Sequence, residues 1–333
     1  MKENKKLMLF THSDLDGFGC LCLANLLSKN SLYNNYTDFN FEICNYDDVD
    51  KKVVDFFNST DFKNDEDGYQ VYITDISVNE ETAELINSTL KDVGIDKLTV
   101  KLYDHHKTST WLGLRYHWCV TIEESWVPDK YGNIFNKRKT CGTELFFNHE
   151  FINRVLERNL IKNSEEFVEL VRYYDTWDWK REDVLEAKRL NNFFSNFDKR
   201  LYFVDNICSK LVLPEEKFKI FTDAENWFLD QKQKEIEEYI LEKEKTMSIE
   251  NETIDGIDYR FGLIELDEPK NVSELGNHVA DKYIDEIDFV MIKSKNVNAI
   301  SLRASDKNDI DVSIIAKAFG GGGHKKAAGY ILD

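Results

Sequence analysis

Acidic and imidazole side chains stand next to one another at Asp104, His105 and His106. The residues just before them, 98–103, alternate apolar and polar side chains, which predicts a strand with a buried face. The cluster therefore follows the carboxyl end of a strand, and open α/β sheets bind ligands at that edge. A carboxylate beside two imidazoles can form part of a metal site.

Carboxylates also follow two earlier apolar runs. Asp14 and Asp16 come after residues 7–10, and Asp75 comes after a later run that ends at Thr74. The repeated order of strand, acidic loop and helix predicts an α/β fold with a mostly parallel sheet and helices on both faces. Parallel strands end at one edge, so we expect these carboxylates to meet in a single crevice. Solvated loop acids are the alternative.

The sequence also predicts the strands and helices that position these side chains. Gly17 and Gly19 predict a tight turn between the first strand and an apolar helix at 20–27. Further strands are expected at 39–44, 71–73 and 98–103, with helices at 53–57 and from Asn79 onward.

The chemistry of these residues suits a hard or borderline divalent cation. Aspartates with one or two imidazoles can bind Mn²⁺, Mg²⁺ or a similar ion, and no thiolate demands zinc. The chain offers more carboxylates than one ion needs, which favours two ions about 3.5–4 Å apart that share a bridging aspartate. Such a pair lowers the pKa of a bridging water and neutralises charge on a phosphoryl group. A single ion with spare surface acids is the alternative.

The second half of the chain contains different elements. Residues 211–250 lack glycine, and their apolar side chains recur at helical spacing, which predicts one long connecting helix. Four glycines, 320–323, precede His324, Lys325 and Lys326, and could present N–H groups and positive charge to an anion. A flexible loop is the alternative. Strands at 259–264, 289–292 and 299–303 and a helix at 312–319 predict a smaller α/β domain here.

Composition limits the possible partners. A net charge of −19 over 333 residues argues against a protein that coats long nucleic acids. From Val290 to Asp333 there are seven Lys or Arg and four Asp or Glu, so this segment should help to hold an anionic ligand. No apolar run approaches about 18 residues, which predicts no membrane-spanning helix. Six cysteines without a CxxC pair, and an N-terminus without a secretory pattern, favour a reduced cytoplasmic protein.

These motifs, in this order, resemble those of the DHH phosphoesterase family, in the branch whose second domain is of the DHHA1 type. The resemblance implies a DHH catalytic domain at 1–205, a helical connection at 206–252 and a DHHA1 substrate-binding domain at 253–333, with the two domains closing over the substrate. The matching segments are Asp14-Leu15-Asp16-Gly17, Thr74-Asp75, Asp104-His105-His106, Asp175, Ser301-Leu302-Arg303-Ala304-Ser305 and Gly321-Gly322-Gly323-His324.

The resemblance also implies roles for individual residues. Asp75 would bridge two Mn²⁺ ions, with Mg²⁺ or Co²⁺ as substitutes. As catalytic residues, His106 would contact the scissile phosphate and Asp104 would orient its neighbours. The metal ligands would be Asp14, Asp16, Asp75, His105 and Asp175. In the second domain, the groups that bind the substrate's phosphate would be Arg303, His324 and the backbone of Gly321, Gly322 and Gly323.

Two positions depart from the family pattern or leave a choice. The pattern places a metal-binding histidine four residues before the first aspartate, where this chain has Phe10. His12 lies only two residues before Asp14 and is kept as a candidate metal ligand. The fourth motif fits Asp175 or Asp178, and Asp175 is preferred because it follows an aromatic and apolar run.

The functional hypothesis is a Mn²⁺-dependent phosphodiesterase, a nanoRNase-like exonuclease that hydrolyses short single-stranded RNA or DNA to mononucleotides. The resemblance implies a two-metal mechanism with a bridging hydroxide. Alternatives are a phosphoesterase for cyclic (di)nucleotides or 3′-phosphoadenosine 5′-phosphate and, in another class, a non-catalytic nucleotide- or RNA-binding module. Neither long duplex nucleic acid nor a membrane is an expected partner, and a homodimer is left open. Candidates for stacking a base are Trp126, Tyr131, Trp177 and Trp179.

Overall fold

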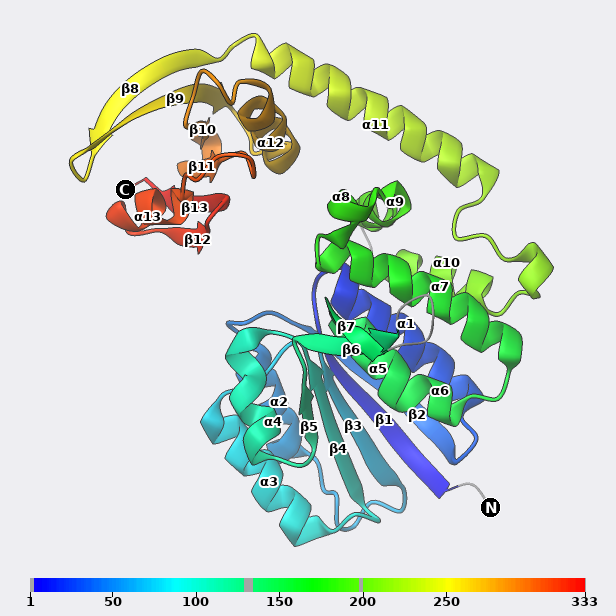
Figure 1. Cartoon of the computed structure of the whole chain (residues 1–333). Helices are drawn as coiled ribbons and strands as arrows, with labels where there is room; N and C mark the ends of the chain where they lie inside the picture. Colours follow the sequence, from blue (N-terminus) through cyan, green and yellow to red (C-terminus); the bar gives the residue numbers. More distant parts are fainter. Residues whose placement is uncertain (1–2, 129–133, 198–199, 333) are drawn as a thin grey trace. The chain divides into compact units, whose positions relative to one another are not determined.

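The computed structural model describes residues 3–128, 134–197 and 200–332. The chain divides into two compact units, one that ends at Thr222 and one that begins at Asp223 (Figure 1). Each unit has a large sheet of its own, and a separate two-stranded hairpin belongs to the first unit. Among the described residues, every helix is too short or too polar to span a membrane.

The large sheet of the first unit has five parallel strands in the order β2-β1-β3-β4-β5, which confirms the predicted parallel sheet. The chain leaves β1 for β2 on one side and returns to β3 on the other. The boundary between β1 and β3 is therefore the point of the sheet where ligands usually bind. The strands are β1 (Glu3–His12), β2 (Asn34–Cys44), β3 (Gly68–Thr74), β4 (Leu98–Asp104) and β5 (Cys119–Thr121).

Helices cover both faces of this sheet, as predicted (Figure 1). One face carries α2 (Val49–Ser59), α3 (Glu80–Val93) and α4 (Thr110–Arg115). The other carries α1 (Leu15–Asn30), α5 (Gly142–Phe146), α6 (Ile152–Arg154) and α7 (Arg158–Asp175). The unit also contains η1 (Lys107–Ser109), the hairpin of β6 (Glu124–Pro128) and β7 (Ile134–Lys139), η2 (Phe147–Phe151), α8 (Asp178–Glu182), α9 (Leu185–Ser195), α10 (Leu201–Leu211) and η3 (Glu215–Lys217).

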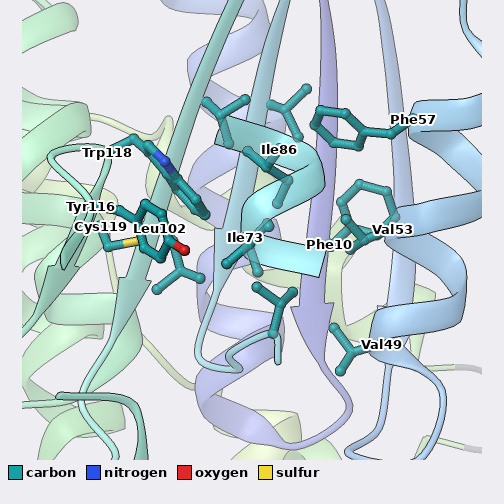
Figure 2. Close-up of a cluster of buried hydrophobic side chains, with 14 of the residues drawn as sticks. Phe10, Val49, Val53, Phe57, Ile73, Ile86, Leu102, Tyr116, Trp118 and Cys119 are labelled. Atoms are coloured by element: carbon teal, nitrogen blue, oxygen red, sulfur yellow. The ribbon is translucent and has the colours of Figure 1, made fainter. Parts of the chain in front are cut away.

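Alternation along the strands builds a core on each face. Phe10, Ile73 and Leu102 point toward α2 and α3 and form one buried cluster with residues of those helices (Figure 2). Tyr72 and Tyr103 point to the opposite face, where both rings contact Phe146 of α5. Because both faces are buried, the strands are held rigidly and their carboxyl ends have fixed positions.

The predicted tight turn at Gly17 and Gly19 is wrong, because both glycines lie inside α1. Their lack of a side chain serves close packing instead. A Cβ on Gly17 would overlap the carbonyl oxygen of His12, and a Cβ on Gly19 would overlap Oγ1 of Thr143. The helix therefore begins directly after the first strand, at Leu15, and holds the acidic segment tightly against the sheet.

The second unit is a mixed six-stranded sheet in the order β12-β13-β11-β10-β9-β8. One buried cluster lies between this sheet and α13 (Val312–Ala318), and another lies between the sheet, α12 (Val272–Lys282) and the C-terminal part of α11 (Asp223–Glu244). Its elements are α11 (Asp223–Glu244), β8 (Ser248–Ile254), β9 (Ile257–Leu266), α12 (Val272–Lys282), β10 (Phe289–Ser294), η4 (Lys295–Val297), β11 (Ala299–Arg303), α13 (Val312–Ala318), β12 (Gly322–His324) and β13 (Ala327–Ile331).

The predicted helix over 211–250 is too long at both ends. Pro214 lacks the N–H that a helix interior needs, and helix α11 begins only at Asp223. At the other end the chain turns into β8, which pairs with β9 through a two-residue connection, Asp255-Gly256. Both of these residues have positive φ, 50° and 81°, which is the conformation of a type I′ hairpin turn.

Candidate metal centre

The carboxyl ends of three parallel strands bring the predicted acidic residues together. His12 ends β1, Asp75 follows β3, and Asp104 ends β4. Three overlapping groups have potential metal-binding atoms within 4.8 Å of one another: His12, Asp14 and Asp75; Asp16, His105 and Asp175; and Asp75, Asp104, His105 and His106.

Asp14 begins helix α1 and lies beside His12. One of its carboxylate oxygens accepts a hydrogen bond of 3.1 Å from the N–H of Gly17. The other lies 2.9 Å from Nδ1 of His12, which in turn is 3.6 Å from Oδ2 of Asp75. Burial alone would raise the pKa of Asp14, but His12 and then the Gly17 N–H lower it to about 2. His12 thus reaches two carboxylates despite its unusual spacing, whereas Phe10 lies in the core.

Asp16 is held by the start of helix α5. Its two oxygens accept hydrogen bonds from the N–H groups of Gly142, at 2.6 Å, and Thr143, at 2.8 Å. A Cβ on Gly142 would lie 2.6 Å from Cβ of Asp75, so only glycine fits at this position. Gly142 and Thr143 are absent from the predicted site, although they belong to the Thr140–Glu144 segment that precedes an apolar helix start.

Asp75 has the most demanding environment in the cluster. Its backbone is left-handed, with φ at 57°, and its side chain is only 1% exposed. Neither carboxylate oxygen has a hydrogen-bond partner among the described residues. Burial, followed by the charges of Asp16 and Asp14, raises the pKa of Asp75 well above its ordinary range. A carboxylate in these surroundings needs a cation to remain ionised.

Asp104 orients the two histidines that follow it. Its Oδ1 accepts hydrogen bonds from the backbone N–H of His105, at 2.9 Å, and of His106, at 3.3 Å. The same oxygen lies 2.7 Å from Nδ1 of His106. Burial lowers the pKa of the His106 ring, but Asp104 outweighs burial, so that this pKa is raised overall. The contact at Nδ1 leaves Nε2 of His106 as the atom that can meet a substrate.

His105 faces the carboxylates. Its Nε2 lies 3.3 Å from Oδ1 of Asp75, 3.5 Å from Oδ2 of Asp175 and 3.7 Å from Oδ2 of Asp16. These distances are ion-pair contacts, and Nε2 of His105 has no hydrogen-bond partner among the described residues. Burial lowers the pKa of His105, which favours the neutral ring that binds metals.

The structure brings Asp175, rather than Asp178, to this cluster. Asp175 ends helix α7, and burial followed by the charges of Asp16 and Asp14 raises its pKa well above the usual range. Asp178 is turned into a separate network, where Arg172 contacts one oxygen at 2.9 Å and Arg181 contacts the other at 3.0 Å.

Unpaired buried atoms show that the cluster fits divalent cations. Charged or polar atoms removed from water without partners are strongly destabilising, and cations between them would supply the missing interactions. Within the described chain, the buried atoms of the cluster without a hydrogen-bond partner are Nδ1 of His12, Oδ1 and Oδ2 of Asp75, Oδ2 of Asp104 and Nε2 of His105.

Tyr46 is a residue of this site that the sequence-based prediction omits. Its hydroxyl lies 3.2 Å from Nε2 of His106, and its ring centroid is 5.2 Å from that of His12. The residue as a whole is 60% exposed, so its ring borders both solvent and the cluster. The signal that could have identified it is its position, two residues after the end of strand β2.

Two of the predicted phosphate-binding residues of the second unit, Arg303 and His324, lie in one row of its sheet. Arg303 on β11 pairs with Ala327 on β13, which pairs in turn with His324 on β12. Residues paired across neighbouring strands point to the same face, so Arg303 and His324 share a face about 10 Å apart. Gly276 leaves room for Arg303, whose guanidinium donates a 2.9 Å hydrogen bond to Oγ of Ser273.

The glycine-rich segment uses part of its backbone within the fold. The N–H groups of Gly320 and Gly321 donate to carbonyls at the end of α13, at 3.0 Å and 2.9 Å. A Cβ on Gly323 would lie 2.5 Å from Cα of Ala328, so glycine here permits close pairing of β12 with β13. The two lysines are also engaged: Lys325 pairs with Asp309, and Lys326 donates to the carbonyls of Asn308 and Ile310.

Of the aromatic candidates for base stacking, Trp126 and Trp177 are exposed. Trp179 is partly buried and its ring lies 6.3 Å from that of Trp177, while Tyr131 lies outside the described residues.

Comparisons with known proteins agree with this arrangement. No protein-family model matches the chain. The chain is 32% identical over 328 residues to the oligoribonuclease NrnB of Bacillus subtilis, which covers 96% of this chain and 71% of that protein. Among solved structures, the pGpG-specific phosphodiesterase PggH of Vibrio cholerae has a TM-score of 0.51 at 12% identity, covering 98% of this chain and 93% of the other. That likeness supports the fold.

Proposed function

The chain belongs to the DHH/DHHA1 family of phosphoesterases, and we propose that it is a metal-dependent phosphodiesterase that hydrolyses short oligonucleotides to mononucleotides. As a member of this family it is a phosphodiester-hydrolysing enzyme. The observation that carries the finer proposal is the cluster of buried, unpaired carboxylate and imidazole atoms around Asp75. The name of its relative, an oligoribonuclease, supports a short oligonucleotide as the substrate.

We propose two Mn²⁺ ions as the cofactor, with Mg²⁺ or Co²⁺ as substitutes. Asp75 belongs to two of the three groups of possible ligands, which supports a bridging role. When bound, two divalent ions would act as Lewis acids that polarise the phosphodiester and activate water. One ion would be held by His12, Asp14 and Asp75, and the other by Asp16, His105, Asp175 and Asp75.

The chain's own contribution centres on His106. Asp104 fixes Nδ1, so that Nε2 is presented to the substrate, and it also favours the protonated ring. The N–H at Nε2 would donate a hydrogen bond to a non-bridging oxygen of the scissile phosphate. Charge that develops on this oxygen strengthens such a bond, and His106 would thereby stabilise the transition state. Tyr46, at 3.2 Å from Nε2, would yield its place to the phosphate.

The first unit would be the catalytic domain and the second unit would bind substrate. Arg303 and His324, on one face of the second sheet, would hold an anionic end of the oligonucleotide, with the backbone of Gly322 and Gly323 beside them. The net charge of −19 supports a short substrate, since long nucleic acids would be repelled. Six free, buried cysteines support a reducing, cytoplasmic location.

The test is a hydrolysis assay with labelled substrates of different length. After removal of metals by a chelator, the protein should cleave RNA dinucleotides and pentanucleotides when Mn²⁺ is added, and long single strands much more slowly. Asp75→Asn should abolish this activity. Asp65→Asn changes an aspartate that pairs with Lys6 near the other end of β1, and this variant should retain the activity. Failure to cleave any short oligonucleotide with Mn²⁺, Mg²⁺ or Co²⁺ would overturn the proposal.

A further inference from the structure

A tryptophan in a strained conformation, Trp177, closely follows the cluster residue Asp175 in the chain. Trp177 has φ at 63° and ψ at 9°, in the left-handed region that bulky residues rarely adopt. It follows Asp175 by two residues, and its side chain is not packed away, because Trp177 is 56% exposed. Such outliers persist only where the surrounding structure enforces them, and they gather at functional sites.

Buried charges enforce this conformation. Arg172, only 1% exposed, lies on helix α7 before the turn, and its Nη1 contacts Oδ2 of Asp178 after the turn at 2.9 Å. Thr176 adds hydrogen bonds of 3.0 Å and 2.8 Å from its N–H and Oγ1 to the carbonyl of Arg172. The backbone on both sides of Trp177 is thus fixed by a network in which its own ring takes no part.

The turn places the backbone of Trp177 close to Asp175, a carboxylate of the cluster. Oδ2 of Asp175 lies 3.5 Å from Nε2 of His105. Trp177 is two residues further along the chain, so the Cα atoms of Asp175 and Trp177 are at most about 7 Å apart. The backbone of Trp177 therefore lies within about the length of one nucleotide of Asp175, and its ring is exposed there. The ring presents an apolar, aromatic surface, whereas the cluster is built from charged groups.

We propose that Trp177 is the platform on which a base of the substrate stacks while its phosphate lies at the metal centre. This inference rests on the proposed function and adds the chemical class that is recognised, a nucleoside with any base, because every base has a face that can stack. On this proposal, the strained turn and the buried Arg172–Asp178 pair keep an aromatic ring exposed to solvent, although exposure of an apolar ring to water is unfavourable.

The test compares variants at Trp177 in hydrolysis of a dinucleotide. Trp177→Gly should raise KM by about tenfold or more, in line with the loss of one stacked base, while kcat changes by less than about twofold. Trp177→Phe should restore most of the affinity. The matched control is Trp227→Ala on helix α11, since Trp227 is 66% exposed in the other unit, and this change should leave KM unchanged.

Thermal unfolding separates a binding role from a structural one. Glycine accepts a φ of 63° without strain, so Trp177→Gly should melt at the same temperature as the wild type or higher. A ring that served packing would make the same variant melt lower, and that result would overturn the proposal. Trp177→Asn, which tolerates the left-handed backbone, is the second ring-free variant and should repeat the effect on KM.

A substrate without a base completes the test. If Trp177 stacks a base, wild type and Trp177→Gly should hydrolyse a dinucleotide with an abasic residue with equal KM. The proposal would be overturned if Trp177→Gly raised KM equally for normal and abasic dinucleotides, or if it left KM unchanged for both. A phosphorothioate dinucleotide that resists hydrolysis tests Trp177 separately from turnover. Its binding can be monitored by the quenching of tryptophan fluorescence. Wild type that binds but does not cleave would refute the proposed function alone.

Discussion

The substitution Asp75→Asn should have opposite effects on stability with and without divalent ions. The amide has the shape of the carboxylate but no charge, and asparagine tolerates the left-handed φ of 57°. In metal-free protein the wild-type carboxylate is buried without a hydrogen-bond partner and faces other carboxylates. The charge is therefore destabilising there, and its removal should stabilise the fold.

The expected size follows from two opposing terms. A buried ion without a partner is destabilising by several kcal/mol after relaxation, whereas the new amide leaves its N–H groups unpaired at a loss of about 1–3 kcal/mol. A net gain of about 1–3 kcal/mol remains, which raises the melting temperature by about 3–10 °C for a unit of this size. With Mn²⁺ at about 100 times its Kd, wild type gains about 2.7 kcal/mol, and the variant should gain little.

The pH dependence of the metal-free protein has a definite sign. Burial and the charges of Asp16 and Asp14 raise the pKa of Asp75, so the folded state keeps a proton that the unfolded chain releases near pH 4. The stability from this proton is fully present below about pH 4 and is lost as pH rises through the raised folded-state pKa. The advantage of Asp75→Asn should therefore widen between pH 5 and pH 8.

The assay is thermal unfolding followed by circular dichroism, with EDTA and with Mn²⁺, across this pH range. Asp178→Asn is the matched control, because Asp178 is also buried but each of its oxygens contacts an arginine. It should lower the melting temperature equally in both conditions. If Asp75→Asn also lowered the melting temperature both with and without Mn²⁺, Asp75 would be a structural residue and the reasoning would fail.

Three further changes test the surroundings of the site. Tyr46→Phe should raise kcat/KM by about 2–10-fold, because the Tyr46 hydroxyl contacts Nε2 of His106 in the free enzyme and must give way to the phosphate. Gly142→Ala should weaken Mn²⁺ binding by about 10–100-fold in a calorimetric titration, since its Cβ would lie 2.6 Å from Cβ of Asp75. Glu244→Gln should destabilise the second unit by about 1–2 kcal/mol at pH 7: burial raises the pKa of Glu244, but three hydrogen bonds lower it to about 2. This stabilisation is present above about pH 4.5 and is lost as pH falls toward 2. The free energies of unfolding of wild type and Glu244→Gln, measured with a denaturant, should therefore become equal near pH 2.

The parallel sheet and the acidic groups that meet at its edge could be predicted because both leave local signals. Apolar runs before Asp14, Asp75 and Asp104 mark strands, and strands of a parallel sheet must end together. Asp175 could also be predicted from the aromatic and apolar residues before it. The choice against Asp178 has a structural reason that the sequence does not display, which is its pairing with two arginines.

Other features depended on contacts between distant segments. Gly17 and Gly19 have the composition of a turn, and only their contacts with His12 and Thr143 explain their place inside a helix. The hairpin at Asp255-Gly256, by contrast, had a local signal, since an Asp-Gly pair typically forms a type I′ turn.

The groups that support the metal centre are backbone N–H groups, and this explains why they could not be predicted. Gly142 and Thr143 hold Asp16 across more than a hundred residues of sequence, and the N–H groups of His105 and His106 hold Asp104. Almost every residue carries such a donor, so the sequence marks the acids but not the groups that fix them. Fixed carboxylates cannot move apart when metal is absent, and their repulsion then remains in the fold. The same backbone contacts that make the site ready for cations should therefore make the stability of the first unit depend on them.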